Sequence, residues 1–327
     1  MVTPLVDGFG RVHRDLRISV TDRCNLRCTY CMPEEGMQWL PRDQVLTFEE
    51  LERVARVAVE RFGFESIRLT GGEPTVRAHL PVLVAKLAAL DVEVSMTTNG
   101  ATLASQAQAY ADAGLSRVNI SLDTLRSDRF LELTRRDRLD DVLAGIDAAV
   151  AAGLGPVKLN VVCMRGVNDD EVVDLATFGR DRGVEVRFIE WMPLDEEHTW
   201  SPGAVVAGEE IIAAIAAVHP LRPLARGSDP AQVWAYDDGR GTVGAIASVT
   251  EPFCGSCDRV RLTAEGALRS CLFSHDETDL RHLLRSGGSD DDLAETMVGC
   301  VAGKRAGHQI GAVTFVQPPR SMSRIGG

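Results

Sequence analysis

The sequence predicts an α/β protein whose larger part is a partial (β/α)6 barrel of the TIM type, followed by a smaller α+β domain. Over about the first 220 residues, short apolar segments rich in Val and Ile alternate six times with segments of helical periodicity. This is the pattern of parallel strands covered by helices. Beyond residue 219 the alternation stops. Six strand–helix units are too few for a closed eight-fold barrel, so an open barrel is preferred. A doubly wound sheet is the alternative.

The strands and helices of the predicted barrel follow one another in chain order. A capping box, with Thr47 as the N-cap and Glu50 three residues later, begins the first helix, and Gly63 ends it. Gly183 ends a later helix in the same way. We expect strands at 16–20, 66–70, 92–96, 117–121, 157–162 and 184–189. We expect helices at 48–62, 79–90, 103–113, 139–152, 169–182 and 208–218.

The ends of the chain differ from this barrel pattern. Residues 1–15 are interpreted as a loose arm. A Pro-containing break at 219–223 separates a barrel at 1–219 from a second domain at 220–327. In the second domain we expect a hairpin (233–236 and 242–248), a short strand pair (259–262 and 267–270) and a helix at 290–302.

Composition narrows the classes of partner. The net charge of −12 argues against a nucleic acid or a membrane surface as a partner, because phosphate groups attract a positive field. A local basic pocket is compatible with this charge. No apolar segment reaches the length of a membrane span, and the first residues lack the apolar core of a signal peptide. We therefore expect a cytoplasmic protein.

Six of the eight cysteines form two groups of three. The first group, Cys24, Cys28 and Cys31, directly follows the first predicted strand. Clustered cysteines in a cytosolic protein indicate metal ligands more often than disulfides. Three thiolates leave one iron of a cubane cluster without a protein ligand, so either a distant cysteine or a substrate fills that place. A structural zinc site is the alternative.

Polar residues follow the predicted barrel strands. The chemistry of parallel barrels lies at the carboxyl ends of their strands, and the second strand leads into the turn 71–74 (Gly-Gly-Glu-Pro). Paired glycines let backbone approach a ligand closely, and a carboxylate suits a cationic amino group. The alternative for residues 71–74 is a tight turn without a ligand. The alternative for the polar residues at the other strand ends is that they cap the following helices; these residues are Thr98, Asn99, Ser121 and Asp123.

The first cysteine group and this turn resemble the two motifs of the radical S-adenosylmethionine superfamily, with Tyr30 directly before Cys31. The resemblance implies a partial barrel and a [4Fe–4S] cluster whose open iron binds S-adenosylmethionine. It implies that Cys24, Cys28 and Cys31 are cluster ligands. It also implies cofactor contacts for Tyr30, Gly72, Glu73, Ser121 and Met192.

The second cysteine group, Cys254, Cys257 and Cys271, again offers three thiolates. A zinc site would need a fourth ligand from elsewhere, such as His275, Cys300 or Cys163. Arg259 and Arg261 are expected on one face of a strand beside this group, where a guanidinium suits phosphate. A solvated strand edge is the alternative.

The segment from residue 253 to 273 is similar to the C-terminal motif of the GTP 3′,8-cyclase family of molybdenum cofactor biosynthesis, which often has Asn at the position of Asp258. The resemblance implies that Cys254, Cys257 and Cys271 hold a second [4Fe–4S] cluster, which binds guanine. The chain end at Gly326 and Gly327 resembles a tail that supports activity. The implied GTP contacts are Arg17, Arg68, Thr98 (or Thr97), Lys158, Arg259 and Arg261.

The resemblance implies a radical reaction. A 5′-deoxyadenosyl radical removes the ribose 3′ hydrogen of GTP, C3′ attacks C8, and Arg17 assists the final reduction. An unidentified electron donor, a downstream cyclic pyranopterin monophosphate synthase and a homodimer are implied partners. A peptide- or protein-modifying maturase with an auxiliary cluster and a zinc-binding interaction protein are the alternatives. The string 299–304 is similar to a P-loop, but it is one residue short and lacks the following Ser or Thr, so we discount it.

Overall fold

A curved, mostly parallel sheet forms the centre of the computed structural model, which describes residues 2–34, 37–227, 229–312 and 315–326. The order of its strands is β14-β13-β12-β3-β4-β5-β6-β7-β8-β11-β10-β9. Strands β3 to β8 lie side by side in chain order, without the reversal of a doubly wound sheet. The partial barrel is therefore confirmed. These six strands are β3 (Asp15–Ser19), β4 (Ser66–Thr70), β5 (Glu93–Thr98), β6 (Arg117–Ser121), β7 (Lys158–Cys163) and β8 (Glu185–Glu190).

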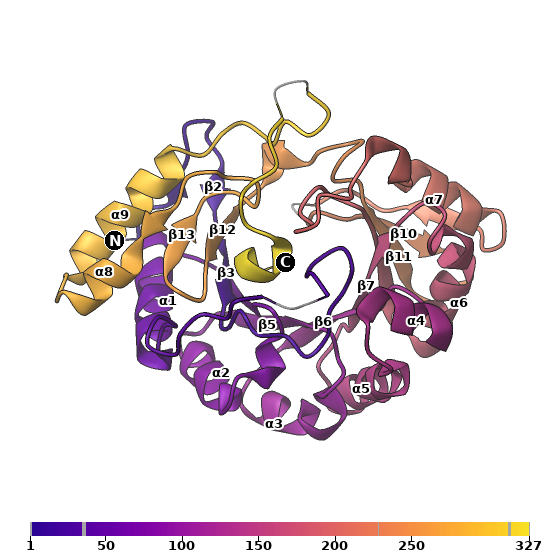
Figure 1. The fold of residues 1–327 in the computed structure, drawn as a ribbon, viewed down its shortest axis with the longest axis horizontal. Helices are drawn as coiled ribbons and strands as arrows, with labels where there is room; N and C mark the ends of the chain where they lie inside the picture. Colours follow the sequence, from indigo (N-terminus) through magenta and orange to yellow (C-terminus); the bar gives the residue numbers. More distant parts are fainter. Residues whose placement is uncertain (1, 35–36, 228, 313–314, 327) are drawn as a thin grey trace.

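Helices cover the outer face of this sheet (Figure 1). Two of the predicted helices begin with a 3-10 turn, at Leu103–Ser105 and Asp169–Glu171. None of the helices in the described parts of the chain has the length and apolar composition to cross a membrane. The barrel helices are α1 (Phe48–Phe62), α2 (Leu80–Ala88), α3 (Ala107–Asp112), α4 (Ser127–Thr134), α5 (Leu139–Ala151), α6 (Val172–Arg182) and α7 (Gly208–Ala216). Of these, α4 was not predicted from the sequence.

Helix α1 shows why the sequence predicts the barrel helices well. Thr47 and Glu50 make the reciprocal bonds of a capping box, and Gly63 ends the helix in the left-handed conformation at φ 69°. The residues that α1 buries, among them Leu51, Val54 and Ala58, recur at helical spacing. They pack against the apolar strands, so one face of α1 becomes part of the main core.

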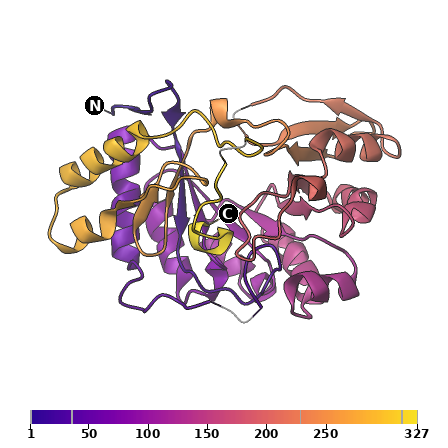
Figure 2. The same ribbon diagram turned by 45° about the horizontal axis from the view of Figure 1, so that its top comes forward.

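The residues after 220 extend the same sheet at both edges. Strand β11 pairs in parallel with β8, and β12 pairs in parallel with β3. The predicted hairpin is β10–β11, and the predicted strand pair is β12–β13. Figure 2 shows these late segments on both sides of the barrel strands. They comprise β9 (Leu221–Pro223), β10 (Gln232–Tyr236), β11 (Thr242–Ile246), β12 (Arg259–Leu262), β13 (Ala267–Arg269), β14 (Thr278–Asp279), α8 (Leu280–Arg285) and α9 (Asp290–Ala302). The division at 219/220 stays a prediction.

The interpretation of residues 1–15 as a loose arm is wrong for the described residues 2–15. Strands β1 (Leu5–Val6) and β2 (Val12–His13) pair with each other, and β1 contacts α9. Asp7, Arg11 and His13 are buried, and Asp7 accepts a hydrogen bond from Arg11 Nε at 2.6 Å. The sequence pattern does not indicate such a segment, because its two strands have only two residues each and three of its buried residues, Asp7, Arg11 and His13, are polar.

The other end of the chain also packs inward. Helix α10 (Met322–Ile325) lies near the centre of the open barrel (Figure 1). Ser19 Oγ donates to the carbonyl of Ile325 at 3.1 Å, and the carbonyl of Gly326 accepts from Arg261 Nη1. The last described residues therefore touch the side chains of β3 and β12 that face the barrel interior.

Candidate functional site

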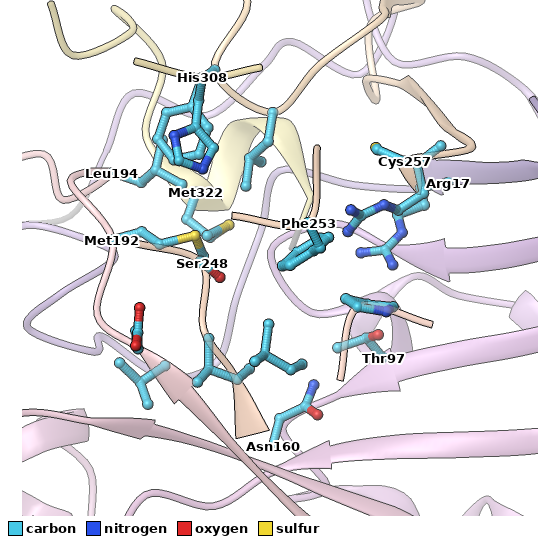
Figure 3. A pocket seen from close by; sticks show the side chains of 18 of the residues that line it. Arg17, Thr97, Asn160, Met192, Leu194, Ser248, Phe253, Cys257, His308 and Met322 are labelled. Atoms are coloured by element: carbon cyan, nitrogen blue, oxygen red, sulfur yellow. The ribbon is translucent and has the colours of Figure 1, made fainter. Parts of the chain in front are cut away.

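A cavity of about 250 Å³ opens among the barrel strands, the second cysteine group and α10. Figure 3 shows Met192 and Met322 on one side of it and Arg17 and Cys257 on another. The cavity thus joins residues from both halves of the chain. The predicted site residues that line it are Arg17, Tyr30, Arg68, Ser121, Met192, Cys254, Cys257, Arg259, Arg261 and Cys271. Those outside its lining are Cys24, Cys28, Cys31, Gly72, Glu73, Thr98 and Lys158.

Three arginines form a row across adjacent strands on this wall. Arg261 of β12 is in register with Arg17 of β3, which is in register with Arg68 of β4. The same register places their side chains on one face, because side chains alternate along each strand. Asp15 is the nearby carboxylate, at 3.6 Å from Arg17 Nε.

Burial and mutual repulsion raise the free-energy cost of these charged guanidinium groups. Burial, together with Arg17 and Arg259, holds the pKa of Arg261 well below its usual range. Burial and, to a smaller extent, the charge of Arg17 lower the pKa of Arg68 to about 9, although Asp15 opposes the shift. A bound polyanion would stabilise the charged form, because an opposite charge within a few ångströms favours it. The row is therefore suited to phosphate groups.

Lys158 and Arg187 form a second group of cations beside the cavity. Lys158 Nζ lies 3.6 Å from Asp229 and 3.9 Å from Glu185, while Arg187 Nη2 donates to Asp229 at 2.8 Å. Arg187 lines the cavity, and the sequence reasoning missed it. The sequence contained a signal for it, because Arg187 lies between the apolar Val186 and Phe188 in a predicted strand. In the structure it is in register with Asn160 of β7.

The Gly-Gly-Glu-Pro turn packs against the backbone that leads into the first cysteine loop. The backbone N–H of Gly72 donates to Thr21 O at 2.8 Å, and a Cβ on Gly72 would lie 2.5 Å from Arg23 O. The close approach predicted for these glycines is therefore, in this structure, an approach to the chain that leads into Cys24.

Glu73 is buried and accepts several hydrogen bonds. Its carboxylate accepts from Thr75 N at 3.0 Å, Thr75 Oγ1 at 2.6 Å, Thr98 Oγ1 at 2.7 Å and Asn99 N at 2.6 Å. Burial raises its pKa, and these donors oppose that shift. Thr98 is thus occupied with Glu73, whereas the adjacent Thr97 lines the cavity.

The first cysteine group lies in a partly buried loop, and none of its thiols is in a disulfide. Burial raises the pKa of Cys24 to about 11 and of Cys31 to about 12, and each of these shifts is increased by a neighbouring negative group. Burial raises the pKa of Cys28, and the charges of Cys31 and Cys24 raise it further, so the three thiols lie near one another. Such thiols ionise when a metal centre supplies positive charge. Their number and mutual approach fit an iron–sulfur cluster.

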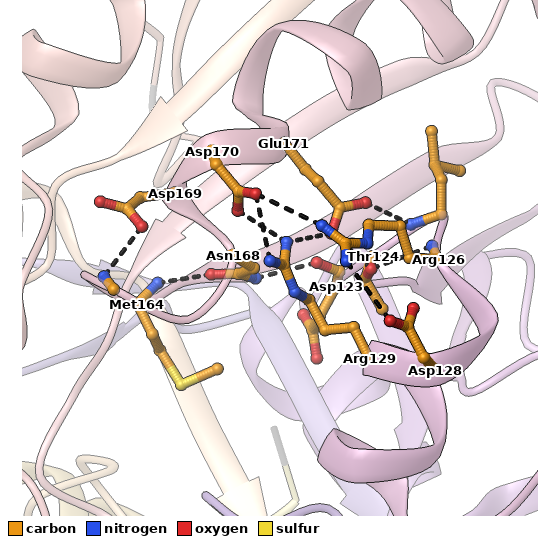
Figure 4. Close-up of polar contacts among 12 residues, drawn as sticks. Asp123, Thr124, Arg126, Asp128, Arg129, Met164, Asn168, Asp169, Asp170 and Glu171 are labelled. Atoms are coloured by element: carbon orange, nitrogen blue, oxygen red, sulfur yellow. Dashed lines mark hydrogen bonds and ion pairs between the residues drawn. The ribbon is translucent and has the colours of Figure 1, made fainter.

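Tyr30 is held within this loop by a buried carboxylate. Its hydroxyl donates to Asp123 Oδ2 at 2.5 Å, and Val162 N donates to Asp123 Oδ1 at 2.8 Å. Asn168 Nδ2 donates to the carbonyl of Asp123, and Figure 4 shows the polar contacts around these residues. Burial raises the pKa of Asp123 to about 6. The helix-capping alternative is wrong for Ser121 and Asp123, since Arg126 occupies the N-cap of α4.

The second cysteine group forms part of the cavity wall. Burial opposes ionisation of Cys257, but Arg259 and Lys304 outweigh it and lower its pKa to about 7. Burial raises the pKa of Cys254. Among the described residues, no three His, Cys, Asp or Glu side chains are close enough together to hold a single metal ion.

The remaining thiols stand apart from both groups. Cys163 is buried at the end of β7, and Cys300 Sγ in α9 is 3.7 Å from Leu268 O. His275 is exposed and contacts Val316 O. Gly327 of the predicted tail lies outside the described residues.

Comparisons with known proteins agree with this site. A model of the "Radical SAM superfamily" matches residues 18–179, and a model of "Molybdenum Cofactor Synthesis C" matches residues 184–310. The structure of Streptococcus suis SuiB bound to S-adenosylmethionine shares the fold, with a TM-score of 0.63 and 15% identity over 90% of this chain and 69% of that chain. Fold and site thus define a radical S-adenosylmethionine protein.

Curated relatives identify the family within this class. A GTP 3′,8-cyclase of Corynebacterium glutamicum is 51% identical over 99% of this chain and 89% of its own length. GTP 3′,8-cyclase 2 of Mycobacterium tuberculosis is 52% identical over 99% of this chain and 92% of its own length. The chain belongs to the GTP 3′,8-cyclase family.

Proposed function

We propose that this protein converts GTP to (8S)-3′,8-cyclo-7,8-dihydroguanosine 5′-triphosphate, the first step of molybdenum cofactor biosynthesis, as a radical enzyme of the lyase class. One observation carries the assignment to a nucleotide triphosphate. The in-register row of Arg261, Arg17 and Arg68 faces the same cavity as a cysteine group and the methionines of the barrel mouth. A buried row of cations requires a polyanionic ligand.

The protein uses two [4Fe–4S] clusters and S-adenosylmethionine. We assign Cys24, Cys28 and Cys31 to the first cluster. When bound and reduced, this cluster would supply the electron that cleaves S-adenosylmethionine into methionine and a 5′-deoxyadenosyl radical, and the radical would take the 3′ hydrogen of GTP.

The chain itself binds and orients S-adenosylmethionine in this proposal. Tyr30, Ser121 and Met192 contact it from the cavity wall, which is where the structure has these side chains. Gly72 lets the turn pack against the cluster loop. Glu73 lies at the same turn, near the amino group, and its hydrogen-bonded carboxylate fixes the ends of β4 and β5.

GTP occupies the opposite side of the cavity. We assign Cys254, Cys257 and Cys271 to the second cluster, which receives the guanine base. The cations that hold the triphosphate in this proposal are Arg17, Arg68, Lys158, Arg259 and Arg261. Thr98 was the threonine predicted to contact GTP, and we now place Thr97 there because its side chain is the one on the cavity.

Arg17 has a second role in the proposal. Its Nε is buried and has no hydrogen-bond partner among the described residues. Burial lowers the pKa of this guanidinium, and Arg259 adds to the shift. A buried positive charge beside guanine stabilises the electron that is added in the final reduction.

We infer a cytoplasmic enzyme that binds no nucleic acid or membrane, which its net charge of −12 supports. An electron donor that is not identified reduces the clusters. A cyclic pyranopterin monophosphate synthase consumes the product, and a homodimer stays a prediction.

The direct test is anaerobic incubation of the reconstituted protein with GTP, S-adenosylmethionine and dithionite, followed by chromatography and mass analysis. The expected product is an isomer of GTP, because the hydrogen lost at C3′ is balanced by the electron and proton gained in the final step. It elutes apart from GTP at the same mass. Cleavage of S-adenosylmethionine without loss of GTP would overturn the proposal. Calorimetry with GTP and with a peptide then separates it from a maturase.

A further inference from the structure

Lys304 is a buried cation that the proposed reaction does not use. It follows α9 and ends the string that is similar to a P-loop, yet only 4% of it is exposed. Its Nζ donates to Arg259 O at 3.0 Å and to Cys257 O at 3.3 Å, and it lies 3.5 Å from Cys257 Sγ. It also lies 2.8 Å from His13 Nε2. The ammonium is therefore aimed at a predicted cluster ligand.

The N-terminal segment holds this arrangement in place. His13 is fully buried, and its Nε2 lies 3.7 Å from Asp7 Oδ2. Arg11 Nη1 donates to Cys254 O at 2.7 Å and to Ala306 O at 2.8 Å. Two buried cations thus hold the second cysteine loop from outside the cavity, Arg11 at Cys254 and Lys304 at Cys257.

The contact with sulfur distinguishes Lys304 from a lysine that only satisfies backbone carbonyls. Carbonyl capping needs a donor but no net charge, and burying an ammonium costs several kcal/mol unless it is compensated. Compensation is strongest where an anion lies close by, and the Cys257 thiolate is the anion that the cluster would provide.

Arg259 is the other cation at Cys257, with which it also forms a hydrogen bond. Arg259 lines the substrate cavity, whereas Lys304 is not part of that lining. The charge of Lys304 is therefore shielded from the arrival and departure of a nucleotide.

We propose that Lys304 is a positioning residue for the second iron–sulfur cluster, whose reduction potential it raises through Cys257. A hydrogen bond to a ligand sulfur and a nearby positive charge both stabilise the reduced, more negative cluster. The string 299–304 thus contributes a lysine to a metal centre instead of to a phosphate. This inference rests on the second cluster of the proposed function.

The test compares the reduction potential of the second cluster between the wild type and its variants. Each protein contains both clusters, and electron paramagnetic resonance monitors their reduction. The signal that changes when GTP is added identifies this cluster. Lys304→Met removes both charge and donor, and Lys304→Gln keeps a donor without the charge. We expect Lys304→Met to disfavour reduction at least tenfold, a shift of about 59 mV to lower potential for one electron, with Lys304→Gln between it and the wild type. Arg305→Met removes an exposed neighbouring charge and should leave the potential unchanged.

A second measurement needs no variant that might misfold. The lysines of the chain are Lys86, Lys158 and Lys304. Lys86 pairs with Glu52 on α1, and Lys158 pairs with Asp229. In a protein labelled with ¹⁵N only at lysine, the labelled side-chain nitrogen beside Cys257 is therefore Nζ of Lys304. We expect a ¹⁵N hyperfine coupling in the reduced second cluster. Its absence, or equal potentials in the wild type and Lys304→Met at full iron content, would overturn the inference. A wild type with two clusters but no GTP turnover would instead contradict the proposed function alone.

Discussion

At the scale of single residues, the alternation of side chains along a strand decides which predicted contacts reach the cavity. Thr97 and Thr98 are neighbours in β5, so they point to opposite faces. The sequence indicates that a threonine at the end of this strand contacts the ligand, but it does not show whether this is Thr97 or Thr98. Both residues end the strand, and the register of the sheet decides which of the two faces the cavity. The structure has Thr97 on the cavity and Thr98 Oγ1 2.7 Å from Glu73.

The two threonines should therefore respond differently to the loss of a hydroxyl. We expect Thr97→Val to raise the KM for GTP several-fold at unchanged stability. Thr98→Val should lower the free energy of unfolding by about 1–3 kcal/mol, because a buried carboxylate loses a donor. Steady-state kinetics and urea unfolding of both variants provide the measurements. Equal KM values for the wild type and Thr97→Val would contradict the placement of Thr97 against GTP.

His13 gives the protein a pH dependence that its position in a supposed loose arm did not suggest. Burial and the charge of Lys304 together lower its pKa to about 4, since a protonated His13 would face that ammonium at 2.8 Å. Unfolded histidine titrates near 6.5. Between these values the unfolded chain binds more protons, so stability is full above pH 6.5 and falls as the pH drops toward 4.

The free energy of unfolding should fall by about 3 kcal/mol between pH 6.5 and pH 4. His13→Gln keeps an acceptor for Lys304 but does not titrate, so its curve should be flatter there. Urea unfolding of the cluster-free chains at several pH values measures this, because cluster binding adds its own pH dependence. Parallel curves for the wild type and His13→Gln would show that another group is responsible.

At the scale of elements, the barrel units were predictable because each combines a local apolar pattern with a local stop signal. Strand β4 has the predicted bounds, and α1 has its predicted capping box and glycine end. Helix α4 and the short strands β1, β2, β9 and β14 were not predicted. The four strands have only two or three residues each, too few to show an alternating pattern, and β1 also packs on α9, a partner far away in the sequence.

The terminal helix α10 is an element whose role depends on one glycine. Gly326 has φ 82°, and a Cβ there would collide with Ser19 Oγ. We expect Gly326→Ala to displace the tail from Arg261 and to lower kcat/KM for GTP at least tenfold, with iron content unchanged. Gly299→Ala is the matched control, because a Cβ at Gly299 meets nothing within 4 Å. Full activity of Gly326→Ala would show that the tail does not support the reaction.

At the scale of the whole molecule, the site exists because the residues after 220 return to both edges of the barrel sheet. The pairing of β12 with β3 brings Arg261 beside Arg17 and sets the second cysteine group on the cavity. The sequence predicted both cysteine groups because their spacing is local, whereas Arg17 and Arg68 were expected only from the family resemblance. It did not predict that they would meet across one sheet, because a parallel pairing across more than 200 residues has no local signal.

The two-cluster organisation predicts a simple change in iron content. The reconstituted wild type should hold about eight irons per chain, four for each cubane. Cys254→Ala should retain about four and still cleave S-adenosylmethionine, but should not consume GTP. Cys300→Ala, outside both groups, should keep the full content. Iron and sulfide analysis gives the answer, and an unchanged iron content in Cys254→Ala would contradict the assignment of the second group.

The central claim, that this cavity directs a radical to the ribose of GTP, is tested most directly by the fate of one hydrogen. The protein would be incubated anaerobically with S-adenosylmethionine, dithionite and GTP deuterated at C3′. We predict that the deuterium appears in 5′-deoxyadenosine as the cyclised isomer of GTP forms. Unlabelled 5′-deoxyadenosine, with the deuterium still on the nucleotide, would contradict the account.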